Sequence, residues 1–324
     1  MVGQPAPAET AHAEQVYSTA LRGSAAASSP IVASWQRCMT LHRLAPEEAR
    51  TPVRLTEREF NLAQEMSGQL VANATDELDR LFAMLGRAGY CILLTDRHGV
   101  ALERRGARGD DKDFYDLGLW TGSVWTEASV GTNGIGTAIA DERCVTVFRD
   151  QHFLCSNIGL SCTTAPIRDH RGQLAAALDI STCRGDVDEM TLSILSQAVR
   201  DAAMRIEINL FRSAFTDARF IMLPAGANSA SALLAVDKDD LVVGATRAAR
   251  LALKLDDGRI AAGLPAADAL QEGRDAPSGE LAEAERAALR RALSRTNGNI
   301  SRAAAALGMS RATLHRKIKK LELH

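Results

Sequence analysis

Apolar side chains recur every three or four residues in two long stretches of the chain, a period that predicts amphipathic helices. In the first stretch, residues 55–86, Thr56 is a good N-cap and Glu59 completes a capping box, so one long helix is expected. The second stretch, residues 188–215, predicts a helix whose apolar stripe is either a seam between two copies of the chain or a surface packed on the chain's own sheet. The stripe consists of Leu192, Leu195, Val199, Ala203, Ile206 and Leu210.

Between these helices the pattern changes to that of β-strands. Residues 90–106 and 162–182 each contain two apolar runs separated by a glycine-containing turn, and each predicts a hairpin. Residues 131–140 predict a helix opened by glycines, and residues 144–148 predict a short strand. Helices and antiparallel strands in this order are typical of an α+β domain with a central antiparallel sheet.

The flanking segments show weaker patterns. Residues 1–29 are rich in Ala, Ser, Pro and Thr with little periodicity, so a flexible arm is expected. Residues 216–270 predict a strand, an Asp-rich turn, a second strand and a helix, too little for a full α/β domain. Residues 271–280 read as a linker by composition.

The segment 281–324 returns to the helical period. Its first helix is expected to end at Gly298, and a second helix covers about 300–307 and ends at Gly308. Ser310 is a good N-cap for a third helix. Two short helices joined by a tight glycine-containing turn predict an all-α helix-turn-helix unit.

The charge distribution supports a DNA-binding role for this unit. The whole chain has 38 Lys and Arg against 40 Asp and Glu, but residues 299–324 carry six basic residues and one acid. Such a local excess is the electrostatic footprint of phosphate binding, and the second helix of these units enters the major groove. The alternative is a solvated basic helix in an ordinary bundle. The side chains predicted to face DNA are those of Ser310, Arg311, Thr313, His315 and Arg316.

Aromatic and cysteine side chains gather between residues 120 and 162, although aromatic residues make up only 4% of the chain. Such a cluster between two strand pairs indicates a small-molecule pocket, and the alternative is that the tryptophans only fill the core. The glycine spacing at 131–136 does not match a dinucleotide-binding loop. The candidate ligand-binding residues are Trp120, Trp125, Phe148, His152, Cys155 and Cys162.

The six cysteines form no CxxC pair and do not lie at zinc-ligand spacing from histidine, so no disulfide scaffold, metal or cofactor is expected. Redox sensing by Cys144, Cys155 and Cys162 stays open, with His152 placed to lower the pKa of Cys155; buried cysteine as a small hydrophobe is the alternative. No stretch is long and apolar enough for a membrane span, and no signal peptide is evident, so a cytoplasmic location is expected.

Several segments between residues 30 and 215 resemble the sensory region of acetoin- and dihydroxyacetone-type transcriptional activators. The segments are PIVASWQRCMTLHRLAPEE, LLTDRHGVALERRG, WTEASVGTNGIGTAIA, VFRDQHFL and GLSCTTAPIRDHRGQLAAALDIS. The resemblance implies a GAF domain over 30–215, followed by a reduced PAS-like piece. The stretch NGNISRAAAALGMSRATLHRKIKKLEL resembles the Fis-family helix-turn-helix. That resemblance implies DNA contacts at Asn299, Ser301, Ser310, Arg311, Thr313, His315, Arg316 and Lys317.

One departure from these activators changes the expected mechanism. They normally carry an ATPase domain with a GxxxxGK[ST] loop between the sensory part and the DNA-binding end, and that motif does not occur in this sequence. The expected protein is a homodimeric, DNA-binding transcription regulator on a two-fold symmetric site, controlled by a small-molecule effector and without ATPase activity. It would act by occupying DNA, by contacting RNA polymerase another way or by pairing with a full-length relative. The alternatives are an adaptor or anti-activator that dimerises with an ATPase-bearing regulator, and a GAF-type reductase of free methionine sulfoxide.

Overall fold

A computed structural model describes residues 7–21, 29–85, 89–223, 232–272, 288–290, 292–293, 296 and 298–320. The chain divides into two compact units, residues 1–267 and 268–324. No helix in this described part combines the length and the apolar composition that a membrane span requires.

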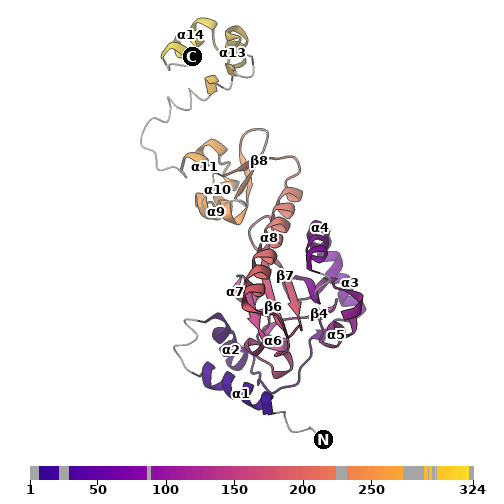
Figure 1. Ribbon diagram of the computed structural model, residues 1–324. Helices are drawn as coiled ribbons and strands as arrows, with labels where there is room; N and C mark the ends of the chain where they lie inside the picture. The colour runs from indigo at the N-terminus through magenta and orange to yellow at the C-terminus, as the bar shows by residue number, and fades with distance from the viewer. Residues whose placement is uncertain are drawn as a thin grey trace. The chain divides into compact units, whose positions relative to one another are not determined.

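A five-stranded antiparallel sheet forms the centre of the first unit, with the strand order β3-β2-β7-β6-β5. In Figure 1 the labelled strands β6 and β7 of this sheet lie beside α8. Both predicted hairpins are confirmed, as is the α+β class. In both hairpin turns an aspartate side chain accepts two backbone N–H groups: Asp96 from His98 and Val100, and Asp169 from Arg171 and Gln173. The strands are β2 (Tyr90–Asp96), β3 (Ala101–Arg105), β5 (Val145–Phe148), β6 (Ser161–Arg168) and β7 (Leu174–Thr182).

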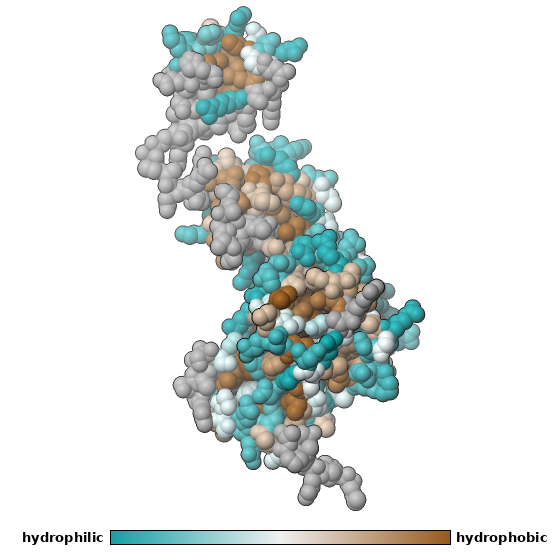
Figure 2. Space-filling view, in the orientation of Figure 1, coloured by the Kyte–Doolittle hydropathy of each residue, from teal (hydrophilic) through white to brown (hydrophobic). Residues whose placement is uncertain are grey.

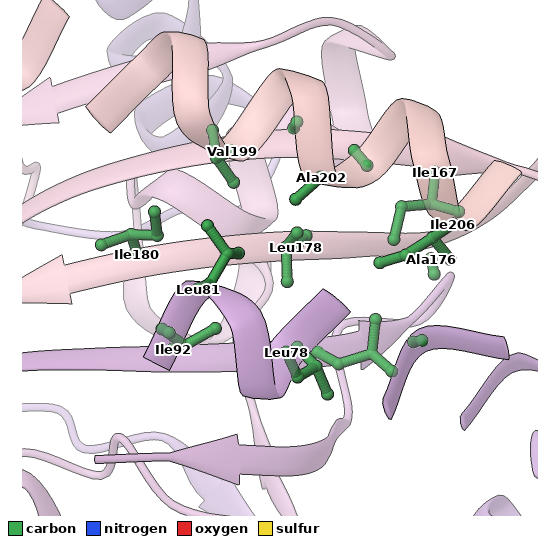
Figure 3. Close-up of a cluster of buried hydrophobic side chains, with 14 of the residues drawn as sticks. Leu78, Leu81, Ile92, Ile167, Ala176, Leu178, Ile180, Val199, Ala202 and Ile206 are labelled. Atoms are coloured by element: carbon green, nitrogen blue, oxygen red, sulfur yellow. The ribbon is translucent and has the colours of Figure 1, made fainter. Parts of the chain in front are cut away.

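One face of the sheet, called here the helical face, is covered by α4 (Gly68–Leu85) and α8 (Glu189–Ala214). Leu78 and Leu81 of α4 and Val199 and Ile206 of α8 meet Leu178 of β7 in one apolar cluster (Figure 3). All five side chains are almost completely buried, so this layer contributes a large share of the hydrophobic stabilisation.

The opposite face, called here the inner face, is covered by shorter elements. Its apolar core includes Leu93 of β2, Phe114, Trp125 and Ile135. Small two-residue strands β1 (Val53–Arg54) and β4 (Ser123–Val124) pair beside it. The covering helices are α2 (Pro30–Thr40), α5 (Asp111–Asp116), α6 (Glu127–Val130) and α7 (Gly134–Asp141), with the 3₁₀ turns η1 (Arg108–Asp110), η2 (Arg149–Gln151) and η3 (Cys155–Asn157).

The expected single helix over 55–86 is wrong. The chain forms α3 (Glu57–Met66) and α4, separated at Ser67, whose φ of −103° and ψ of 9° leave the helical region. Ser67 is followed by Gly68, and a serine–glycine pair is a common place for a helix to break. The predicted capping box of Thr56 and Glu59 is present, but no residue of α3 is buried.

The helix from Asp188 onward is confirmed as α8, and Asp188 caps it by accepting the N–H of Thr191. Of its apolar stripe, Leu192, Leu195, Val199, Ala203 and Ile206 are buried against the sheet and α4, and Leu210 packs beside them. Of the two predicted alternatives for this stripe, packing on the chain's own sheet is therefore confirmed and a dimer seam along it is wrong.

The expected flexible arm at 1–29 is wrong for residues 7–20, which form α1 (Pro7–Ala20). Val16 is completely buried, and the Tyr17 hydroxyl donates to Glu47 at 3.0 Å. Alanine-rich sequence has high helix propensity, and here one buried face docks the helix on the inner-face layer.

Residues 216–270 follow α8 and form a small three-stranded sheet in the order β10-β9-β8. The predicted order of strand, Asp-rich turn, strand and helix is confirmed. Phe215, next to the last residue of α8, packs so closely on Gly244 that a Cβ there would lie 2.3 Å from its ring. The elements are β8 (Arg219–Met222), β9 (Leu233–Val236), β10 (Val242–Ala245), α9 (Arg247–Leu253), α10 (Asp257–Ala261) and α11 (Ala266–Glu272).

The second unit contains α13 (Ile300–Ala306) and α14 (Arg311–Lys320). Leu314 is completely buried and packs with Leu289, Ala303 and Ala304 in a small core of its own. The predicted linker at 271–280 and the beginning of the predicted helix after residue 281 lie outside the described residues, apart from residues 271 and 272.

Candidate functional site

The two short helices of the second unit are joined as the sequence predicts. Asn299 caps α13 by accepting the N–H of Arg302 at 3.1 Å, and Ser310 caps α14 by accepting the N–H of Thr313 at the same distance. Gly308 between the helices has a φ of +63°, a conformation that glycine adopts without strain. Local sequence chemistry therefore defines a tight helix-turn-helix.

Six of the eight residues predicted to contact DNA have exposed side chains around this turn, and all eight lie on or beside α13 and α14. Leu314 and Ile318, on the other side of α14, pack inward. Residues 298–320 contain no acidic side chain, so the positive charge of this unit is not neutralised locally. In Figure 2 hydrophilic side chains surround an apolar centre in this unit. The exposed residues are Asn299, Ser301, Ser310, Arg311, His315 and Arg316, while Thr313 and Lys317 are half-buried.

A second polar site lies on the inner face of the central sheet. Cross-strand pairing places Arg104 opposite Leu93, Leu93 opposite Asp179, and Asp179 opposite Thr164, in one row across four strands. Residues in one such row point to the same face of the sheet. Charged and hydroxyl side chains are thus gathered in a layer that is otherwise apolar.

The Asp179 carboxyl group is the centre of this polar row. Thr164 and Ser181 each donate a hydroxyl hydrogen bond to it at 2.5 Å. Burial raises the pKa of Asp179 to about 6, although the two hydroxyl donors act in the opposite direction. Gly134, in the first turn of α7, lies directly above: a Cβ there would be 2.4 Å from Thr164 Oγ1 and 3.0 Å from Asp179 Oδ1.

Cys162 and His152 form the next part of this cluster. The Sγ atom of Cys162 lies 3.5 Å from Nε2 of His152, whose Nδ1 is 2.9 Å from the carbonyl oxygen of Arg149. Burial lowers the pKa of His152 to about 4, and burial together with the charge of Asp179 raises the pKa of Cys162. A neutral imidazole beside a neutral thiol does not activate the sulfur as a nucleophile.

A third group of polar side chains attaches α2 to this layer. The Arg37 guanidinium donates to both carboxylate oxygens of Glu127, at 2.8 and 2.7 Å, and lies 3.0 Å from Asp141. Ser34, completely buried, donates to the same Glu127 carboxylate at 2.5 Å. Sequence reasoning missed these residues, since a serine and an arginine within a helix give no local signal of a partner about ninety residues away.

The candidate ligand residues between 120 and 162 do not form one pocket. His152 and Cys162 belong to the inner-face cluster, and Trp125 is core, with its indole N–H donating to the Gly118 carbonyl at 3.0 Å. Phe148 faces the other side of the sheet and packs beside α8, where it lines a surface pocket of about 330 Å³. Phe148 therefore does not share with Trp125, His152 and Cys162 the one pocket that the sequence predicted.

The remaining two candidates lie at different edges of the inner-face layer. Cys155 begins η3, where its backbone N–H donates to the Pro46 carbonyl at 2.9 Å. The sequence pairs it with His152, but that imidazole contacts Cys162 instead. Trp120 stacks on Arg104, whose Cζ lies 4.3 Å from the ring centroid. Among the described residues no three His, Cys, Asp or Glu side chains are grouped as a metal site requires.

The fold and these two sites define an α+β domain followed in the chain by a helix-turn-helix unit. Residues 4–208 match the family described as the MimR N-terminal domain, and residues 280–321 match the helix-turn-helix of bacterial regulatory proteins of the Fis family. The chain belongs to the MimR N-terminal domain family.

Curated relatives are transcriptional regulators. The acetoin catabolism regulatory protein of Cupriavidus necator is 31% identical over 68% of this chain and 34% of its own length. The propane 2-monooxygenase operon transcriptional activator MimR of Mycolicibacterium smegmatis is 28% identical over 60% of this chain and 32% of its own length. The chain thus matches about one third of the length of these relatives.

One solved structure shows the same fold. The crystal structure of the E. coli DhaR(N)–DhaL complex superposes with a TM-score of 0.52 and 16% sequence identity, over 71% of this chain and 77% of that chain. At this identity the likeness concerns the fold alone.

Proposed function

We propose that this chain is a DNA-binding transcription regulator in which a small molecule held on the inner face of the central sheet controls the C-terminal helix-turn-helix. The observation that carries the proposal is the exposed α13–α14 unit, basic and without acidic residues from 298 to 320, in a chain whose residues 4–208 match the MimR N-terminal domain family. In this proposal residues 30–215 are a GAF sensor, 216–270 a PAS-like piece, 271–280 a linker and 281–324 the DNA-binding unit.

The eight predicted DNA contacts are part of the proposal. Their exposure around one turn supports it, since a recognition helix must present side chains to base edges while its other face stays packed. A single unit of this kind buries little DNA surface, so we propose that two copies of the chain bind a two-fold symmetric site. The apolar stripe of α8 is not the surface that joins them, because it is buried.

Control without ATP hydrolysis is the third part of the proposal. Residues 209–279 separate the two matched regions, and the GxxxxGK[ST] motif does not occur there. We therefore propose that the effector changes DNA occupancy directly. The buried, neutral Cys162 and His152 do not favour thiol catalysis, so the methionine sulfoxide reductase alternative receives no support from this site.

Genome-wide mapping of the bound sites, with three forms of the protein, tests this function. The wild-type chain should give discrete peaks that share a palindrome, and Arg311→Ala should lose them. Lys238→Ala is the matched control, because it removes the same charge from an exposed turn of the first unit and should keep the peaks. Peaks that require an ATPase-bearing relative would favour the adaptor, and unchanged peaks with Arg311→Ala would contradict the assigned interface.

A further inference from the structure

Arg104 is an arginine whose side chain is 90% buried at the end of β3, with 10% of its surface exposed. Its Nη1 donates to Asp111 Oδ1 at 2.8 Å. The other two nitrogens, Nε and Nη2, are buried and have no hydrogen-bond partner within the described part of the chain. A buried donor is costly to leave unpaired, and more so when it carries charge. These two N–H groups therefore indicate an acceptor that the described residues do not supply.

The two unpaired nitrogens form one binding edge. In a guanidinium group the Nε–H and one Nη2–H point the same way, and their spacing matches the two oxygens of a carboxylate. Asp111 occupies Nη1 on the other edge, so it orients the group without using this one. The free edge of Arg104 therefore has the geometry of a bidentate carboxylate receptor.

The surroundings fix the plane of the guanidinium group. Trp120 lies against one face of the guanidinium, with 4.3 Å between Arg104 Cζ and the centroid of the indole ring. The centroid of the Phe114 ring lies 5.6 Å from the same Cζ. Gly106 lies beside the terminal nitrogens: a Cβ there would be 2.6 Å from Nη2, 3.0 Å from Cζ and 3.5 Å from Nη1. Only a residue without a side chain leaves space for the guanidinium in this position.

The charge balance on this face also favours an anion. Asp111 is the ion-pair partner of Arg104. The side chain of Asp111 is 38% exposed, so solvent weakens the electrostatic attraction between the two groups. Asp179 stands in the same cross-strand row, but Leu93 lies between them and Thr164 and Ser181 already hydrogen-bond to it. Burial raises the pKa of the nearby Cys91 thiol to about 12, although the charge of Arg104 acts in the opposite direction, so this thiol adds no negative charge here. The apolar side chains of Leu93 and Phe114 on this face suit a short carbon skeleton.

We propose that the effector site of this chain takes a small organic carboxylate, held by the Nε–H and Nη2–H groups of Arg104 and stacked beside Trp120. This inference rests on the proposed sensory role of the inner face and names the ligand class for it. It assigns recognition to a residue that the sequence pattern did not single out.

Calorimetric titration and thermal shift of the full chain test this assignment, with acetate, propanoate and lactate as probes and propanamide and acetoin as neutral analogues. At least one carboxylate should bind and raise the melting temperature more than its neutral analogues do. Arg104→Gln should weaken binding by about tenfold to a hundredfold, because both charge-assisted hydrogen bonds are lost. Arg104→Lys keeps the positive charge but not the two parallel N–H groups, so its affinity for the carboxylate should lie between those of the wild type and Arg104→Gln.

Arg105→Gln is the matched control, since Arg105 is the next residue, points to the other face of the sheet and pairs with Asp79 and Glu103. It should bind carboxylates like the wild type. Circular dichroism and DNA binding show whether each variant is folded. The assignment is overturned if no carboxylate probe binds the wild type, if Arg104→Gln keeps full affinity, or if propanamide or acetoin binds as well as the carboxylates.

The same samples separate this inference from the proposed function. Specific DNA binding without carboxylate binding would overturn only the ligand class. Carboxylate binding that depends on Arg104, in a chain without specific DNA binding, would support this site and contradict the regulator.

Discussion

Cys162 Sγ lies 3.5 Å from His152 Nε2 beneath the glycine-rich start of α7, and burial favours the neutral form of both groups. The His152 side chain is completely buried, and its Nδ1–H donates to the Arg149 carbonyl oxygen. Nε2 is then the acceptor for the thiol hydrogen. This pair is a structural contact between two neutral groups on the inner face of the sheet.

Thiol labelling is expected to follow exposure along the chain. Cys183 is exposed, whereas Cys162 is 3% exposed and holds a neutral thiol, and the thiolate is the reactive form. In the native protein iodoacetamide should modify Cys183 first and leave Cys162 unmodified until the chain unfolds. Peptide mass spectrometry over a labelling time course measures this order. Early modification of Cys162 would support redox sensing at this cluster.

The pH dependence of stability is expected to reveal Asp179. Its folded pKa of about 6 lies above the ordinary value of 3.8, so the folded state gains stability as pH falls from about 6 toward 4 and loses it as pH rises. Asp179→Asn removes this dependence. The free energy of unfolding of the variant, minus that of the wild type, should rise by up to about 3 kcal/mol between pH 4 and pH 7.

His152 acts in the opposite direction, because its pKa is lowered to about 4: its contribution is lost as pH falls from about 6.5 toward 4. Both proteins in the comparison contain His152, so its effect cancels in the difference. Urea unfolding at a series of pH values gives that difference. A difference that stays constant across this range would show that the Asp179 carboxyl group is not perturbed by burial.

Gly134→Ala is expected to destabilise the packing of α7 on the inner face of the sheet. The new Cβ would lie 2.4 Å from Thr164 Oγ1, inside the hydrogen-bonded cluster around Asp179, and such overpacking costs about 1–3 kcal/mol. Gly68→Ala at the start of α4 is the control: a Cβ there meets nothing within 4 Å, so it should be neutral or stabilise by less than about 1 kcal/mol. Thermal unfolding compares them, and equal melting temperatures would contradict the close packing of α7.

Asn299 has a capping role that can be separated from its predicted DNA contact. Asn299→Ala removes the acceptor of the Arg302 N–H and should cost the second unit about 1 kcal/mol of stability. Asn299→Asp keeps the acceptor and should leave stability near the wild-type value. Its added negative charge should nevertheless weaken DNA binding if Asn299 lies near a phosphate. Thermal unfolding followed by far-UV circular dichroism measures the stability, and fluorescence anisotropy with labelled DNA measures the affinity. A DNA affinity of Asn299→Asp equal to that of the wild type would exclude the contact.

Arg311 and Lys317 are expected to contribute differently to DNA binding. If Arg311 reads a base, Arg311→Ala should cost about 1–3 kcal/mol on the specific site and relax the preference at one position. If Lys317 contacts a phosphate, Lys317→Ala should weaken binding to all DNA sequences alike. It should also reduce the slope of log K against log salt concentration by about one. Anisotropy titrations on specific and random DNA over a range of salt distinguish these results. Equal losses on both DNAs for both variants would contradict the assigned roles.

The sequence by itself determined the elements whose signals are local. Aspartate–glycine turns define both hairpins, Asp188 and Ser310 cap their helices, and Gly308 provides the turn between α13 and α14. These signals act over a few residues and are not changed by distant packing. The turn between α13 and α14 and the exposure of Arg311 and Arg316 were therefore predictable.

Only the tertiary structure decided which residues meet on the inner face. Both faces of the sheet are buried, so the alternation along β5 does not tell whether Val147 or Phe148 lies on the inner face. The pairing of Cys162 with His152 and the unpaired edge of Arg104 arise from strand register and from loops far apart in the chain. The same holds for the stripe of α8, since an apolar helix face has the same sequence pattern against its own sheet as against a second copy.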